Sequence, residues 1–178
     1  MIEAYLQHEE ERKAQGIPAL PLNPEQTKSL CSLLQDPPAG KEDFLMHLFT
    51  QRISPGVDPS AEVKADFLGK IISKEVNSPL ISRVEAVRIL GTMMGGYNIQ
   101  HLIDALKDDE LKDEAAKALS SMVMIYDAFD DVFELSKSND AAKKVVESWA
   151  AAEWFTSKPE FPKTIKVKVF KVDGEINT

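Results

Sequence analysis

The sequence is poor in the residues that most often hold metals or attack substrates. Its 178 residues include one cysteine and three histidines. A single thiol forms no internal disulfide and supplies too few ligands for a structural zinc ion or an iron–sulfur cluster. Nearby leucines place Cys31 on the apolar side of a helix, so we expect a buried thiol. His8 stands alone, and we expect His47 and His101 at the margin of the core, because none of the three matches a metal-binding spacing.

Long apolar runs are also missing. No stretch approaches the roughly 20 apolar residues that a membrane helix needs. The first residues, MIEAYLQHEEERK, lack the basic start and the apolar segment of a secretory signal. We therefore expect a cytoplasmic protein with no membrane partner.

The sequence has fewer basic than acidic residues, 21 against 29, and the formal net charge is −8. Acidic residues are spread along the chain, and such a surface repels phosphate backbones, which argues against binding to a nucleic-acid duplex. One basic cluster near the C-terminal end is an exception: Lys158, Lys163, Lys166, Lys168 and Lys171. We interpret it as the solvated face of a strand, where lysines discourage pairing at an open sheet edge.

No set of residues matches a catalytic motif, so we predict no catalytic, cofactor-binding or metal-binding residue in this chain. Acidic pairs such as Asp108-Asp109 are adjacent on a helix and do not face one another. The one unusual segment is Gly95, Gly96, Tyr97 and Asn98, because two glycines are costly inside a helical pattern. It is either a turn between helices with Asn98 as the N-cap, or a close-contact surface against a neighbouring domain or a ligand channel.

Apolar residues at spacings of three and four, together with capping signals, predict a chain made mostly of helices. Asn23-Pro24-Glu25-Gln26 resembles a capping box, and Asp58-Pro59 offers an N-cap followed by a proline at the first helical position. A second capping box begins at Ser82. The predicted helices cover about 2–13, 24–35, 41–53, 59–76 and 139–155, with further helices in the repeated region from Ser82 to Phe133.

An internal repeat occupies the middle of the chain. EAVRILGTMMGGY (85–97) aligns with EAAKALSSMVMIY (114–126) at an offset of 29 residues (114 − 85), and an amphipathic segment follows each copy. The repeat predicts tandem helix-turn-helix units, which bury their faces by stacking. Their style resembles HEAT repeats, although the period is shorter than the roughly 40 residues usual for those. The expected fold is therefore all-α, with HEAT-like stacked helical hairpins in an α-superhelix.

The last residues follow a different period. In KTIKVKVFKVDGEINT (163–178), apolar residues and lysines alternate, which predicts a β-strand, and Asp173-Gly174 predicts a hairpin turn. The change of period places a boundary near 159–162. We therefore expect a HEAT-like helical domain over 1–158, followed over 159–178 by a linker and a short strand or hairpin whose sheet is missing.

Five segments, in order along nearly the whole chain, resemble a known family: DPPAGKEDFL (36–45), ISPGVD (53–58), LGTMMGGYNIQHLIDAL (90–106), SWAAAEWF (148–155) and VFKVDGEINT (169–178). They are similar to the N-terminal part of bacterial aconitase B, the bifunctional aconitate hydratase and 2-methylisocitrate dehydratase. The resemblance implies a HEAT-like domain, then a swivel domain, then the domains that hold a 4Fe-4S cluster. Residues 159–178 would then be the linker and first strand of a truncated swivel domain.

For function, the resemblance implies that the parent polypeptide is a lyase of the tricarboxylic acid cycle. It would interconvert citrate and isocitrate through cis-aconitate, and would also dehydrate 2-methylisocitrate. This fragment alone would be inactive and would bind no cluster. Its implied roles are protein interaction, homodimer formation and support of the substrate channel. Its implied partners are the swivel and catalytic domains downstream and, for the parent without its cluster, messenger RNA.

Other functions remain open from the residues alone. The chain could be an RNA-binding module that uses the lysine-rich strand, in which case its affinity would fall steeply with salt. It could also be a stand-alone helical scaffold, or a small enzyme with a ligand site at the turn formed by Gly95 and Gly96.

Overall fold

The structure, a computed structural model, describes residues 1–122, 125–126 and 128–152. This part of the chain is all-α, as predicted, and contains no strand. The predicted strand and Asp173-Gly174 turn within 163–178, and the boundary near 159–162, lie outside the described residues. The helices are α1 (Ile2–Ala14), α2 (Pro24–Gln35), α3 (Glu42–Gln51), α4 (Pro59–Ile72), α5 (Arg83–Gly91), α6 (Ile99–Ala105), α7 (Lys112–Ser120), α8 (Ala128–Ser136) and α9 (Asp140–Ala150).

Side-chain caps fix several of the helix starts. The Asn23 side chain accepts a hydrogen bond from the backbone N–H of Gln26 at 2.8 Å, and the Gln26 side chain accepts one from the backbone N–H of Asn23 at 3.0 Å. Asp58 accepts from the N–H of Ser60, and Ser82 accepts from the N–H of Glu85. These bonds satisfy N–H groups that have no partner within the helix, and they confirm the predicted starts.

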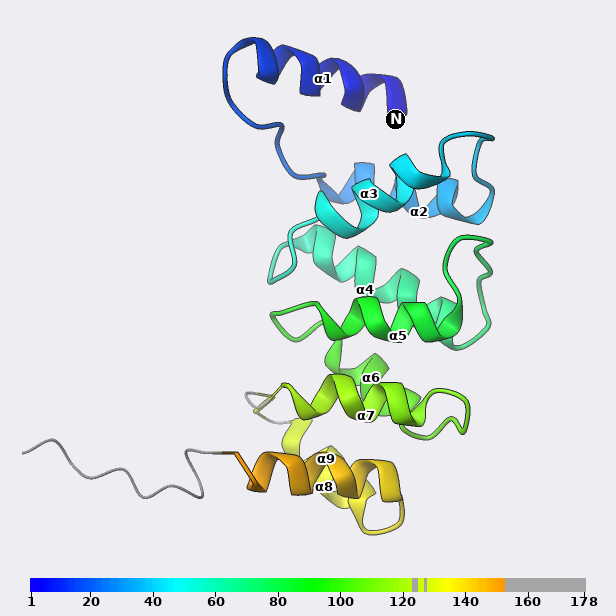
Figure 1. Ribbon diagram of the computed structural model, residues 1–178, viewed down its shortest axis with the longest axis vertical. Coiled ribbons are helices and arrows are strands. Elements are labelled where there is room, and N and C mark those ends of the chain that lie inside the picture. Colours follow the sequence, from blue (N-terminus) through cyan, green and yellow to red (C-terminus); the bar gives the residue numbers. More distant parts are fainter. Residues whose placement is uncertain (123–124, 127, 153–178) are drawn as a thin grey trace, which may run out of the picture.

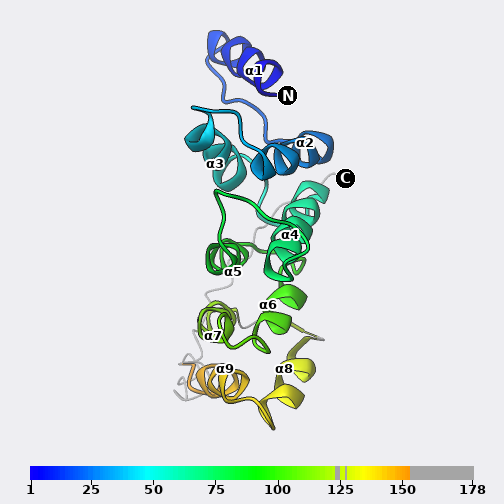
Figure 2. The same cartoon turned by 90° about the vertical axis from the view of Figure 1, so that its right-hand side faces the viewer.

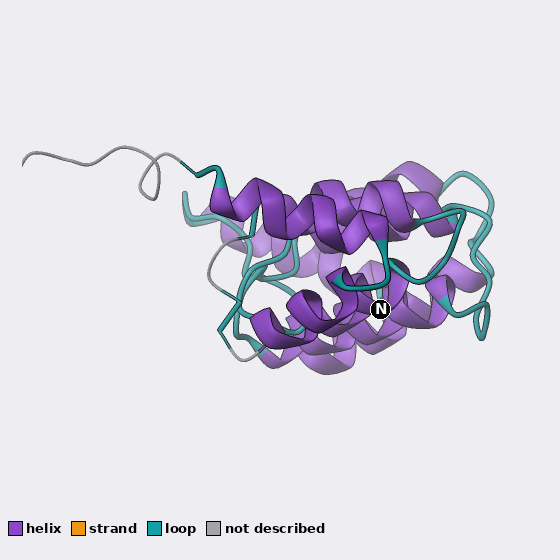
Figure 3. Ribbon diagram, turned by 90° about the horizontal axis from the view of Figure 1, so that it is seen from below, coloured by secondary structure: helices purple, strands orange, loops and turns teal. Residues whose placement is uncertain are grey.

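The helices are stacked along one long axis in two layers (Figures 1 and 2). One layer contains α3, α5, α7 and α9, and the other contains α2, α4, α6 and α8. The view along the stack shows the two layers lying side by side (Figure 3). The first helix, α1, lies at the top of the stack in Figure 1. This arrangement is consistent with the predicted stacking of helical hairpins.

The 29-residue repeat appears directly in the helix positions. Helices α5 and α7 begin 29 residues apart (112 − 83), as do α6 and α8 (128 − 99). Helix α5 packs against α6, as the first predicted unit requires. Helix α4 also packs against α5, α6 against α7, and α8 against α9. Packing therefore continues from one pair of helices to the next along the stack, as in tandem stacked units.

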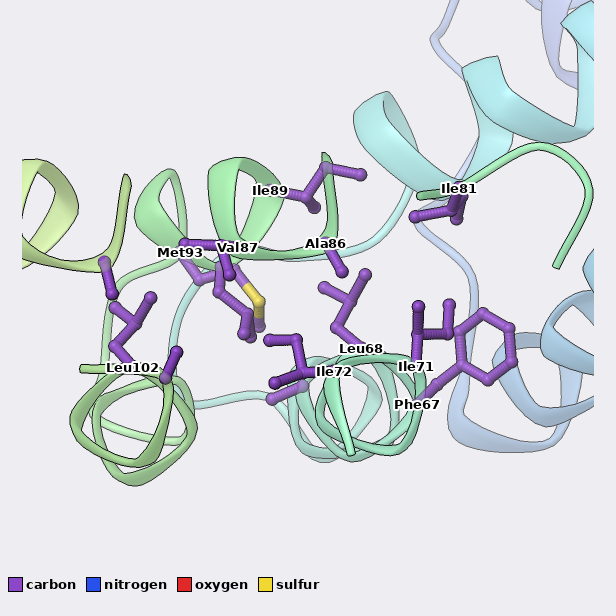
Figure 4. Close-up of a cluster of buried hydrophobic side chains, with 14 of the residues drawn as sticks. Phe67, Leu68, Ile71, Ile72, Ile81, Ala86, Val87, Ile89, Met93 and Leu102 are labelled. Atoms are coloured by element: carbon purple, nitrogen blue, oxygen red, sulfur yellow. The ribbon is translucent and has the colours of Figure 1, made fainter. Parts of the chain in front are cut away.

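The core runs between the two layers for the length of the stack. Between α4 and α5, Leu68, Ala86 and Val87 are all 0% exposed. Figure 4 shows Leu68 directed from α4 towards Ala86 on α5. Phe49 and Phe67 meet edge to face, with ring centroids 5.8 Å apart. Fully burying one such side chain stabilises the fold by roughly 1.5–3 kcal/mol, so this layer-to-layer contact is the main source of order in the stack.

Within the described residues, none of the helices combines the length and the apolar character needed to cross a membrane.

Candidate functional site

The turn at Gly95 and Gly96 joins α5 to α6 and lies against the loop between α3 and α4. Both glycines have positive φ, +93° and +101°, a conformation that glycine adopts without strain. The N–H of Met94 donates a hydrogen bond to the carbonyl of Pro55 at 2.6 Å. A Cβ atom on Gly95 would lie 2.7 Å from the carbonyl carbon of Gly56. Glycine is therefore required at this position because two backbones touch, and the contact joins two surface loops of the same chain.

Asn98 differs from its predicted role. It stands at the N-cap position of α6 but makes no side-chain cap there. Its amide nitrogen instead donates to the carbonyls of Leu90, at 2.8 Å, and Met93, at 3.2 Å. The last carbonyls of a helix lack partners within it, so the Asn98 side chain caps the end of α5. Asn98 is only 1% exposed, so its side chain lies in the interior and not at a surface.

Exposed apolar side chains lie beside this turn. Val57 is 75% exposed and Met94 is 63% exposed, on the two loops that the Met94–Pro55 hydrogen bond joins. The hydroxyl of Tyr97 lies 3.5 Å from the carbonyl oxygen of Val57. Tyr126, 76% exposed, lies on the next loop of the stack, between α7 and α8. We call Val57, Met94, Tyr97 and Tyr126 the loop edge. These loops lie on the left-hand side of Figure 1.

The described methionines of the two repeat copies differ in their exposure. Met93 is 3% exposed and belongs to the core, whereas Met94 beside it faces solvent. Met122 is partly buried against the core. Met124 lies outside the described residues.

The cysteine and two of the histidines differ in their exposure to solvent. Cys31 is buried, as predicted, and burial raises the pKa of its thiol to about 12. The ring of His101 packs against Gly69 at the core margin. His47 is exposed and not at the core margin, because α3 turns that side of the helix towards solvent. The described residues contain no group of three or more His, Cys, Asp or Glu side chains placed to hold a metal ion.

Asp108, from the acidic pair Asp108-Asp109, has a structural role. Its carboxylate pairs with the guanidinium of Arg83 and accepts a hydrogen bond from the N–H of Glu110. Arg83 also pairs with Glu110 at 2.5 Å and donates to the carbonyl of Ile72. The hydrogen bond from Arg83 lowers the pKa of Asp108. Arg83 therefore ties the start of α5 to the end of α4 and to the loop before α7.

The sequence reading missed one residue of chemical interest, Lys64. It is only 3% exposed. A signal for this burial was present, since Lys64 precedes Phe67 by three residues and Leu68 by four, the spacing of one helix face. The residue type nevertheless argues against burial of Lys64, because lysines are rarely buried without a partner.

Comparison with known proteins agrees with the resemblance seen in the sequence. Residues 4–155 match the family described as "Aconitate B N-terminal domain". Three relatives named aconitate hydratase B align with the whole chain: those of Pseudomonas aeruginosa (52% identical), Synechocystis sp. (51%) and Escherichia coli (50%). The chain spans 21% of the length of each of these relatives. Because the family match covers most of the described helices, the chain belongs to the aconitate hydratase B family and corresponds to its N-terminal domain.

Proposed function

We propose that this chain is the N-terminal scaffold and interaction domain of an aconitate hydratase, and that the loop edge is where the rest of the same polypeptide docks. The proposed organisation is a helical domain over 1–158 and, over 159–178, a linker and the first strand of a swivel domain. The parent enzyme would be a cytoplasmic lyase of the tricarboxylic acid cycle, interconverting citrate and isocitrate and also dehydrating 2-methylisocitrate. The chain would also support the substrate channel and homodimer formation.

The loop edge is the observation that carries this proposal. Stacked helical repeats present extended surfaces for binding, and exposed apolar patches on such surfaces mark interaction sites. Val57 and Met94 are held together by the backbone contact at Gly95, so they form a preformed patch. Preformed patches lose little conformational entropy on binding. The occupant we propose is the remainder of the polypeptide, because the relatives carry about four fifths of their length outside the region matched here.

The residues of this chain do not fit a 4Fe-4S cluster. A 4Fe-4S cluster is held by several cysteine thiolates, and this chain has only Cys31. That thiol is buried, and its raised pKa disfavours the thiolate that binds iron. The cluster and the hydration reaction would therefore depend on residues supplied by the remainder of the parent enzyme.

The direct test is association in trans. The 178-residue chain would be mixed with the part of the Pseudomonas aeruginosa relative that follows the aligned region, and binding would be measured by titration calorimetry. We expect a complex that Met94→Asp and Val57→Asp weaken by about tenfold or more, since each buries a charge in an apolar contact. Leu6→Asp is the matched control, because Leu6 is an exposed apolar residue on α1, away from the loop edge.

Three results would contradict the proposal. The first is no complex at all, and the second is equal weakening by the control variant. The third is citrate turnover by the chain alone after cluster reconstitution. Light scattering on the isolated chain tests the proposed homodimer. Retention of RNA that falls steeply between low and high salt would favour the RNA-binding alternative.

A further inference from the structure

Lys64 is a buried cation with no anionic partner in the described part of the chain. It lies on α4 and is 3% exposed. Its ammonium lies 5.1 Å from the centroid of the Phe49 ring. Among the described residues, no carboxylate pairs with it and no hydrogen bond reaches it. The ring face offsets only part of the cost of removing an ammonium group from water, so this position is unfavourable unless a partner arrives.

The ammonium is nevertheless the major form of Lys64 at neutral pH. Burial lowers the pKa of Lys64 from 10.5 to about 8. Cys31 keeps its proton at neutral pH, because its own pKa is raised to about 12. The buried group is therefore a positive charge beside a neutral thiol and an aromatic ring.

Lys64 lines a pocket between the end of α3 and α5. The pocket has a volume of about 450 Å³, which is within the range of small-molecule sites. Its polar lining includes Gln51 from α3 and both Arg88 and Glu85 from α5. Arg88 donates to Glu114 at 2.9 Å and lies 3.7 Å from Glu85, so two carboxylates already neutralise it. Lys64 is the cation of this pocket that lacks a described counter-ion.

We infer that this pocket binds a small oxyanion carrying a carboxylate or phosphate group, with the Lys64 ammonium as its principal contact and Arg88 at its rim. An anion oxygen would supply the partner that Lys64 lacks. Lys64 is only 3% exposed, and a charge-assisted pair at such a partly desolvated position is stronger than one on the open surface. The net charge of −8 disfavours diffuse anion binding elsewhere on the surface, so binding here should be local. The site does not depend on the proposed scaffold role.

Thermal unfolding of the 178-residue chain tests the site. Sodium chloride would be replaced stepwise by sodium succinate in one series and by sodium phosphate in another, at constant ionic strength. The two series distinguish a carboxylate from a phosphate ligand. We expect a rise of about 4 °C when the anion reaches ten times its Kd, with a further logarithmic rise at higher anion concentration. Lys64→Met should abolish the rise, whereas Lys28→Met, at an exposed position on α2, should retain it.

The Lys28→Met control separates binding from general salt effects, because excluded anions stabilise all folded variants alike. Equal shifts in the parent chain and in Lys64→Met, or no shift with either anion, would overturn the proposal. Arg88→Gln provides a second variant at an exposed rim position and should reduce the shift, because it leaves the Glu85 carboxylate unneutralised in the pocket lining. Carbon-13 spectra of the lysine side chains give a readout that needs no substitution. The Lys64 signal should move on addition of the anion, and an unmoved signal would contradict the site.

Discussion

Replacing Lys64 by methionine should stabilise the folded chain, which is unusual for a buried position. In the folded state the pKa of Lys64 falls from 10.5 to about 8. Each pKa unit corresponds to about 1.4 kcal/mol, so holding the charged form inside the fold costs about 3 kcal/mol. A cation–π contact with the Phe49 ring offsets about 1 kcal/mol of this cost of burying the charge. Methionine has a similar length and no charge, so Lys64→Met should raise the free energy of unfolding by about 2 kcal/mol at pH 7.

The pH dependence of this gain follows from proton binding. Below pH 8 both the folded and the unfolded chain hold the Lys64 proton, and the parent chain carries the full penalty. Between pH 8 and about 10.5 the unfolded chain keeps the proton while the folded chain loses it. The unfolded state then binds more protons, so the stability of the parent chain rises with pH. The advantage of Lys64→Met should therefore shrink from pH 8 upwards by about 1.4 kcal/mol per pH unit and vanish at about pH 9.5.

The assay is urea unfolding of both chains in chloride buffer without oxyanions, followed by circular dichroism at several pH values. The difference between the two chains isolates Lys64, because every other group titrates in both. The reasoning is refuted if Lys64→Met is less stable than the parent chain at pH 7, or if the difference does not change between pH 7 and pH 10. An unchanged urea m-value would show that both chains unfold from the same compact state.

Three further predictions concern the turn and the thiol. Gly95→Ala should destabilise the chain by about 3 kcal/mol in urea unfolding, because its Cβ would overlap the backbone of Gly56 and φ is positive. Gly56→Ala is the control, since its Cβ meets nothing within 4 Å, and equal losses would contradict the backbone contact. Asn98→Ala should cost about 2 kcal/mol by removing the buried side-chain hydrogen bonds to the carbonyls of Leu90 and Met93, and an unchanged midpoint would refute this cap. Cys31 should react with a thiol reagent at pH 8 only at the rate of unfolding, and fast reaction in the folded state would contradict its burial and raised pKa.

Local signals predicted the helix starts well. The capping box of Asn23 and Gln26 and the N-cap Asp58 depend on residues within four positions of one another, so the sequence contains all that is needed to place them. The repeat offset of 29 residues likewise reappears in the starts of α5 and α7. The similarity of five sequence segments to aconitase B also identified the family, because such similarity depends on residue identity alone.

The candidate site was predicted only in part. The two glycines were recognised as a turn or close approach, but the partner backbone at Gly56 lies about 40 residues away along the chain. Asn98 was placed at the correct helix boundary, yet its side chain serves the preceding helix. Local pattern cannot choose between two helix ends that are equally near in sequence, because the choice depends on which carbonyls the fold buries.

The sequence by itself determined the all-helical class of the described residues, the caps, the repeat period and the family, because each of these depends on short-range periodicity or on direct similarity. The tertiary structure decided which helices pair, that Gly95 touches Gly56, and that Lys64 lies buried without a described counter-ion. These features arise when residues distant in sequence compete for the same buried space. That competition is settled by packing between α3, α4 and α5, which no short window of sequence contains.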